Sequence, residues 1–196
     1  LRLLIVASRA PEQAFSLLQA HLEALYDTLE ALGDQVEGEW LWPAAPENLS
    51  ARLEAKKQPA IDVLYLETQL PSRQLNDILS GQRVPLLILT VMPQSEGQSL
   101  PMEEELAQFL ANSSLPNAVV LDGRLTDVQI KLALTALFAS LVGGHAVRHA
   151  VDEAQRSLRS ATAEHPRPWA DAGNVLSPEA AIRLARTEEG KPLLVV

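Results

Sequence analysis

The stretch Val84–Val91 (VPLLILTV), followed by the loop Met92–Gly97 (MPQSEG), decides the predicted fold. Nearly every residue of Val84–Val91 is apolar, which is typical of a strand buried on both faces, such as a central strand of a parallel sheet. In open α/β sheets, ligands and catalytic groups gather outside the carboxyl ends of the strands. The loop after this strand is therefore the first place to look for functional residues.

Composition sets the class of protein. The chain has 196 residues, of which 47% are hydrophobic, enough to fill the core of one α/β domain. The formal net charge of −9 and the lack of any Lys/Arg cluster argue against a nucleic-acid surface. No apolar run approaches the roughly 18 residues that span a bilayer, and no leader precedes the first predicted strand. We therefore expect a cytoplasmic protein that binds neither nucleic acid nor membrane.

The chain contains no cysteine. Disulfides, thiolate metal sites and a cysteine nucleophile are thereby excluded from this sequence. The first residue is Leu1 rather than methionine, and the last five residues, 192–196, have the apolar pattern of a strand. We expect the chain to be a piece of a longer polypeptide.

Outward from the central stretch, predicted strands alternate with predicted helices. Apolar runs predict strands at 1–7, 35–42, 61–66, 84–91 and 118–121. Helical spacing and capping residues predict helices at 11–32, 43–57 after an opening turn, 71–79, 101–112, 126–142 and 146–161. This order predicts an α/β three-layer sandwich with a mostly parallel, doubly wound central sheet and right-handed crossovers.

Several residues mark where the helices begin and end. Gly33 is placed to end the first long helix, and Thr126 to cap the start of the long apolar helix after the fifth strand. Gly143 and Gly144 break that helix. The strand at 35–42 alternates apolar and polar residues, as a peripheral strand would.

The sequence changes in character near residue 164, so we divide it into a domain at 1–163 and a C-terminal extension at 164–196. Ser177-Pro178-Glu179 predicts a helix up to about residue 188, and 192–196 a strand. This extension is either the last helix and edge strand of the same domain or the start of a following module.

Common cofactor and catalytic motifs are missing. The turn after the first strand, Ser8–Pro11, has no glycine for a dinucleotide site, and no Walker-type phosphate loop is present. A phospho-receiver needs carboxylates at the tips of the first and third strands, where only Glu67 stands. No Gly-x-Ser-x-Gly turn for a serine hydrolase exists either. No cofactor is expected.

The histidines do not predict a metal site. His145, His149 and Glu153 follow one another at intervals of four residues, which is metal-ligand spacing on one helical face. A zinc peptidase motif would need glutamate at Ala146, and no second segment completes a ligand set. We therefore expect a solvated helix face. His21 and His165 have no partner visible in the sequence.

Five passages, in order and spacing, carry a resemblance to a known family. They are the opening strand LRLLIVAS, the turn PAAPENL, the third strand IDVLY, the strand VPLLILT, and the helix start LVGGHAV, which Ala150 and Ala154 follow. Over 1–159 the chain resembles the CHAT domain, a caspase-like module of bacterial signalling and conflict-system proteins. The resemblance implies the caspase-like topology.

The family's peptidase activity uses a histidine at the tip of the third strand and a cysteine at the tip of the fourth. The resemblance places Gln69 at the histidine position, with Leu70 in place of the neighbouring glycine, and Met92 at the cysteine position. Glutamine is no general base near neutral pH, and a thioether does not attack a carbonyl. We therefore expect no catalytic residue and no enzymatic activity.

The resemblance favours a protein-interaction or regulatory module within a larger bacterial signalling or defence protein, with a partner protein or neighbouring domains. Its candidate binding crevice lies at the strand tips and comprises Ser8, Arg9, Glu67, Gln69, Met92, Gln94, Ser95 and Asp122. Met92 would supply an adaptable apolar floor there. In the alternative, these are only loop residues of a structural domain.

Two further functions remain open from the sequence. A small-molecule or nucleotide sensor could use the same crevice, with Arg9, Arg73 and Arg124 as an anion pocket. Hydrolysis by Glu67 with Asp122 is less favoured, because the fourth strand is expected to lie between their strands.

Overall fold

The computed structural model describes residues 1–7, 15–41, 44–55, 57–67, 72–91, 109, 115–123, 125–164 and 182–186. This part of the chain has the α/β architecture that the sequence predicts. Its helices and strands are, in order, β1 (Arg2–Ala7), α1 (Phe15–Leu32), the 3-10 turn η2 (Gly33–Gln35), β2 (Glu37–Trp40), α2 (Pro46–Glu54), β3 (Val63–Glu67), α3 (Ser72–Leu79), β4 (Leu86–Val91), β5 (Asn117–Asp122), α5 (Asp127–Val142), α6 (Val147–Glu164) and β6 (Ile182–Arg186).

The described strands form one sheet in the order β2-β1-β3-β4-β5-β6. All neighbours from β2 to β5 are parallel, and β6 is antiparallel to β5. The chain first builds outward from β1 to β2 and then returns to place β3, β4 and β5 on the other side of β1. The prediction of a mostly parallel, doubly wound sheet is confirmed.

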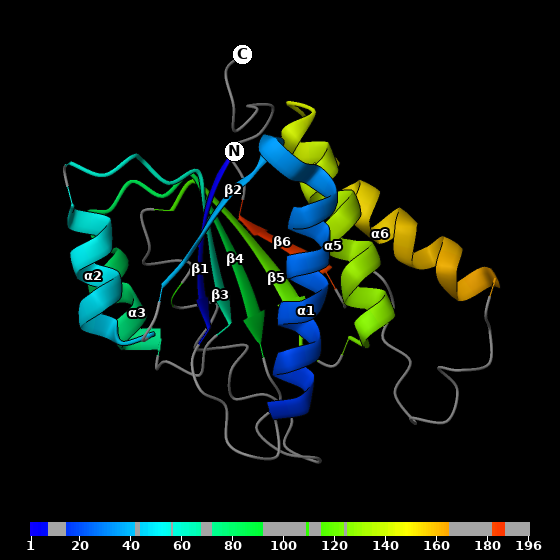
Figure 1. Cartoon of the computed structure of the whole chain (residues 1–196), viewed down its shortest axis with the longest axis horizontal. Coiled ribbons are helices and arrows are strands. Elements are labelled where there is room, and N and C mark those ends of the chain that lie inside the picture. The colour runs from blue at the N-terminus through cyan, green and yellow to red at the C-terminus, as the bar shows by residue number, and fades with distance from the viewer. Residues whose placement is uncertain are drawn as a thin grey trace.

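Helices cover both faces of the sheet and complete three layers (Figure 1). On one face lie α2 and α3, and on the other lie α1, α5 and α6, with α5 packed between α1 and α6. Each layer buries its own set of apolar side chains. The fold is therefore a three-layer sandwich with one core on each side of the sheet.

The central stretch of the sequence lies where its composition predicts. Leu86 and Ile88 of β4 face the core beneath α1 and α5, whereas Leu87 and Leu89 face the core beneath α2 and α3. All four are buried. The strand begins only after Pro85, which has no N–H to donate, and the Asn117 side chain donates to the Pro85 carbonyl at 3.0 Å. Burial on both faces of this strand is confirmed.

The strand β2 is an exposed edge, as its alternating sequence predicts. All four of its residues are exposed, and its described partner is β1. Glu37 forms an ion pair with Arg2 at 3.1 Å, and both carboxylate oxygens of Glu39 accept hydrogen bonds from Arg52 at 2.6 Å. On the other face, Gly38 lies so close to Leu29 of α1 that an added Cβ would approach it to 3.2 Å.

The C-terminal prediction is wrong in its secondary structure. We expected a helix from Ser177 to about residue 188, but Ile182–Arg186 forms the strand β6, which pairs with β5. The described part of the extension thus completes the sheet as an edge strand. The strand expected at 192–196 lies outside the described residues, as does the helix expected at 101–112 except for Phe109, which is helical and buried.

Helix α5 begins with the capping arrangement that the sequence predicts. The Thr126 hydroxyl accepts a hydrogen bond from the Gln129 amide at 3.4 Å, and the Gln129 side chain accepts one from the Thr126 amide at 3.0 Å. Gly33, with a φ of 55°, and the pair Gly143-Gly144 end their helices as expected.

Replacement of the cap, Thr126→Ala, is expected to lower the free energy of unfolding by about 0.5–2 kcal/mol, because an amide of the first helical turn loses its acceptor. Thr126→Ser keeps a hydroxyl at this place and is expected to stay close to the parent protein. Urea denaturation followed by circular dichroism measures both. Equal stability of the alanine and serine variants would contradict the role of the cap.

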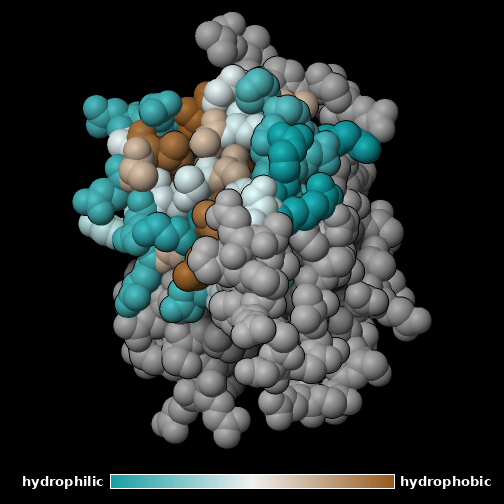
Figure 2. Space-filling model, turned by 90° about the vertical axis from the view of Figure 1, so that its right-hand side faces the viewer, coloured by the Kyte–Doolittle hydropathy of each residue, from teal (hydrophilic) through white to brown (hydrophobic). Residues whose placement is uncertain are grey.

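Helix α6 lies at one side of the sandwich, next to α5 and away from α1. Figure 2 views this side and shows hydrophilic residues over much of its described part, beside a smaller area of hydrophobic ones. Among the described residues, no helix is both long enough and apolar enough to cross a membrane.

Candidate functional site

The carboxyl ends of the parallel strands meet at one edge of the sheet. Ala7 at the end of β1 pairs in register with Glu67 at the end of β3, and Glu67 pairs with Thr90 near the end of β4. Val91 of β4 pairs with Asp122 at the end of β5. The described ends of β1, β3 and β4 are therefore neighbours at this edge, which is where a crevice is expected in such a fold.

Only part of the predicted crevice lies within the described residues. Glu67 and Asp122 are described, and they are separated by β4 as expected. The remaining predicted residues lie outside the described part: Ser8, Arg9, Gln69, Met92, Gln94 and Ser95.

The anion pocket expected from three arginines lies largely outside the described part. Arg9 and Arg124 are outside it, and of Arg73 only the backbone, within α3, is described. Its helix packs on the sheet face opposite α1 and α5.

Glu67 has a buried partner that the sequence prediction missed. His21 of α1 places its Nδ1 atom 3.1 Å from Glu67 Oε1. The exposed fraction of the side chain is 0% for His21 and 1% for Glu67. The His21 Nε2 atom donates to the Leu125 carbonyl, which lies 2.9 Å away between β5 and α5. The sequence shows no partner for His21, whereas the structure gives it two.

Both members of this pair have shifted pKa values. Burial raises the pKa of the Glu67 carboxyl, and the hydrogen bond from His21 only partly opposes this shift. Burial lowers the pKa of His21, but its hydrogen bonds to Glu67 and to the Leu125 carbonyl outweigh burial and raise it overall. Each shift has an ordinary physical cause, desolvation or a hydrogen bond to the protonated form.

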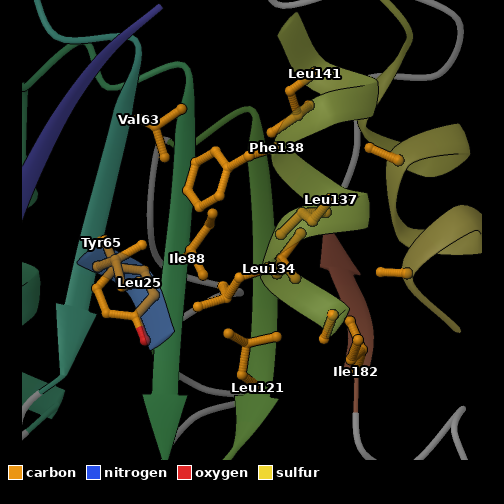
Figure 3. Packing of buried hydrophobic residues seen from close by; sticks show 14 of the residues in the cluster. Leu25, Val63, Tyr65, Ile88, Leu121, Leu134, Leu137, Phe138, Leu141 and Ile182 are labelled. Carbon is orange, nitrogen blue, oxygen red and sulfur yellow. The ribbon is translucent and has the colours of Figure 1, made fainter. Parts of the chain in front are cut away.

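A second buried polar contact lies beside the pair. Thr90 of β4 donates its hydroxyl to the Tyr65 oxygen on β3 at 3.0 Å, and both residues are fully buried. Figure 3 shows the Tyr65 hydroxyl pointing toward the carboxyl ends of the strands. Burial, followed by the nearby Glu67 charge, raises the pKa of Tyr65, so its phenol stays protonated. The described carboxyl edge thus contains buried polar groups beside a largely apolar core.

The arrangement of His21 leaves no free ring nitrogen for catalysis. A general base must accept a proton from the reacting group through a nitrogen lone pair. The two nitrogens of His21 are engaged by Glu67 and by the Leu125 carbonyl. His21 is therefore placed as a structural residue of the core and not as the base of a catalytic dyad.

The histidines at the start of α6 form a solvated group, as the sequence predicts. The rings of His145 and His149 lie 4.6 Å apart, and His149 Nε2 lies 3.5 Å from Glu153, which also accepts a hydrogen bond from Arg156. His149 is about half exposed. Within the described ranges, no group of three or more histidine, cysteine or acidic residues could hold a metal ion.

The helical spacing of the residues around His21 could have identified it as buried. It lies four residues before Leu25 and seven before Thr28, and both of these are buried on the same face of α1. A polar residue on the apolar face of a helix generally requires a buried partner. The sequence contains that signal, but it does not name the partner, because Glu67 and Leu125 are 46 and 104 residues away along the chain.

Comparison with known proteins gives no family assignment: no protein-family model matches the chain, and no curated protein matches it significantly.

Proposed function

We propose that this chain is a catalytically inactive caspase-like domain that acts as a protein-interaction or regulatory module of a larger bacterial signalling or defence protein. The observation that carries the proposal is the parallel pairing of β3 with β4, which sets Glu67 beside Thr90. Gln69 and Met92 each come two residues after one of this pair. A caspase-like dyad requires its two residues to follow neighbouring strands in this way.

The residues at these positions support a binding role instead of a catalytic one. A base-and-nucleophile pair across adjacent strands, which lie about 4.8 Å apart, would need an imidazole and a thiolate. Gln69 and Met92 provide an amide and a thioether. An amide donates and accepts hydrogen bonds, and a thioether packs adaptably against apolar groups. Such a pair is suited to holding a peptide rather than cleaving it.

Further hydrogen-bonding residues follow the strands in the sequence. Gln94 and Ser95 follow β4 in the sequence and carry hydrogen-bonding side chains, and Asp122 ends β5. His21 supports the inactive assignment, since both of its nitrogens are already bound within the core.

A random peptide library displayed on phage tests the proposal. We expect the purified chain to enrich peptides that bind at the carboxyl edge and remain uncleaved. Met92→Asp should weaken binding of a selected peptide by about tenfold or more, because it places a charge where an apolar contact is expected. Isothermal titration calorimetry measures the affinity, and mass spectrometry of the peptide detects cleavage.

The matched control is Ser80→Asp, which adds the same charge at an exposed position between α3 and β4, at the opposite edge of the sheet. It should bind the peptide as the parent does. Cleavage of the selected peptides would overturn the inactive assignment. Failure to enrich any peptide, together with a raised melting temperature in the presence of a nucleotide, would favour the sensor function instead.

A further inference from the structure

The contact between His21 and Leu125 fixes one proton on the imidazole. A carbonyl oxygen only accepts hydrogen bonds, so His21 Nε2, 2.9 Å from the Leu125 oxygen, must carry a hydrogen. In a neutral histidine the other nitrogen, Nδ1, then has a lone pair and no hydrogen. The position of Leu125 thus selects the tautomer of His21.

The contact with Glu67 requires a second proton. His21 Nδ1 and Glu67 Oε1 lie 3.1 Å apart inside the core. If histidine were neutral and the carboxylate ionised, two lone pairs would face each other at this distance. A proton between them, on either atom, turns the contact into a hydrogen bond, and the pair as a whole is then uncharged. The pair therefore holds one proton more than a neutral histidine and an ionised glutamate do separately.

The surroundings favour this uncharged, protonated form. Removal of the shared proton would leave a net negative charge in the core, which burial opposes strongly. The pKa values of both groups are raised, as this requires. The negative charge of Asp127 on α5 acts in the same direction, because it favours protonated His21. The phenol of Tyr65 on β3 remains neutral and adds no charge beside the pair.

The pair joins three parts of the fold. His21 belongs to α1, Glu67 is the last residue of β3, and Leu125 lies directly before the Thr126 cap of α5. Glu67 is also two residues before Gln69 along the chain. The pair therefore connects α1 with the end of β3 and with the segment between β5 and α5.

We propose that His21 and Glu67 form a proton-dependent lock, which holds the end of β3 and the β5–α5 connection against α1 while the shared proton is bound and weakens when rising pH removes it. The lock stands independently of the proposed function, since it rests on contacts within the described core. If the strand-tip crevice does bind a peptide, the lock would also make that site sensitive to pH.

Nuclear magnetic resonance of the intact chain tests the protonation state directly. In a sample labelled with nitrogen-15, the His21 signals are assigned by their loss in His21→Gln. We expect Nε2 to carry its hydrogen throughout and the Nδ1 signal to show no change of protonation near pH 6.5, the ordinary pKa of histidine, because the pair keeps its shared proton well above this pH. Titration of His21 near pH 6.5, or an unprotonated Nε2, would overturn the proposal.

The pH dependence of stability gives a second test. In the unfolded chain His21 is neutral above pH 6.5 and Glu67 is ionised above pH 4.5, whereas the folded pair retains one more proton. Unfolding above pH 6.5 therefore releases a proton, and the unfolding equilibrium constant should rise by up to about tenfold per pH unit from this pair alone. Because both pKa values are raised in the folded protein, the contribution of the shared proton is fully present below pH 6.5 and is lost as rising pH removes that proton.

The variant Glu67→Gln removes the titratable group and keeps a side chain that can donate to neutral Nδ1. Its unfolding constant should lack this tenfold rise. The matched control is Glu153→Gln, which alters an exposed histidine–glutamate pair on α6 and should keep the parent's pH dependence. Equal pH dependence in Glu67→Gln and the parent would overturn the lock. If Glu67→Gln does not fold, the nuclear magnetic resonance titration of His21 in the parent protein tests the proposal by itself.

Discussion

Phe138→Ala is expected to lower the free energy of unfolding by about 3–5 kcal/mol, one of the two largest effects we anticipate for a single substitution. Phe138 is 0% exposed and lies in the second half of α5. Figure 3 shows its ring pointing from the helix onto the sheet. The truncation removes apolar surface from the core and leaves a cavity between two layers, and both effects destabilise the folded state.

Val128→Ala is the matched control on the same helix. Its side chain is 61% exposed, so its loss should change the free energy of unfolding by no more than about 0.5 kcal/mol. Urea denaturation measures both variants, provided that the unfolding free energy depends on urea concentration with a similar slope in each. A cost for Phe138→Ala close to that of Val128→Ala would show that α5 does not pack on the sheet as described.

The second large effect is expected from His21→Leu, at about 3–5 kcal/mol of unfolding free energy. The substitution removes the imidazole that solvates the Glu67 carboxyl inside the core and the donor that binds the Leu125 carbonyl. Buried polar groups that lose a hydrogen-bond partner on folding are costly, because water satisfies them in the unfolded chain. Denaturation at pH 6 compares the variant with the parent.

A double substitution separates the pair from its surroundings. His21→Leu/Glu67→Leu removes both polar partners, so it should cost clearly less than the sum of the two single substitutions. Asp27→Asn serves as the control, since it breaks an exposed ion pair with Lys131 and should cost at most about 1 kcal/mol. Strict additivity of the two leucine substitutions would contradict an energetic coupling between His21 and Glu67.

The parallel part of the sheet could be predicted because the apolar pattern of its strands is visible in the sequence itself. The run Val84–Val91 is apolar on both faces, and the structure buries it on both faces. Thr126 with Gln129 is a local capping pattern that needs no distant contact. These features depend on neighbouring residues alone, so the sequence is sufficient to predict them.

The edge strand β6 could not be predicted in the same way. Residues 179–186 (EAAIRLAR) have the composition of a helix, rich in alanine and arginine, after a Ser-Pro-Glu capping pattern. The structure instead pairs Ile182 with Leu121 of β5 and buries it in the core. Pairing with the distant strand β5 outweighed the local preference of this segment for a helix. No residue near Ile182 in the sequence indicates such pairing.

In the candidate site too, the positions of the strand ends could be predicted from the sequence, whereas a long-range contact could not. Ala7, Glu67, Thr90 and Asp122 reach one edge of the sheet, as parallel strands predict. The interaction of His21 with Glu67 brings a helix face to a strand end, and its two residues are separated by 46 positions. A single sequence shows that a buried histidine needs a partner, but only the packing of α1 on the sheet selects which one.

The charged strand β2 bears on how copies of this protein behave at high concentration. An open sheet edge is a template on which another chain can add a strand, and this is a common route to aggregation. Here the edge is only four residues long, and it carries Glu37 and Glu39, each held in place by an arginine. A second chain that added to this edge would have to displace or bury these ion pairs, which is costly, so the sheet protects its own open side from uncontrolled growth.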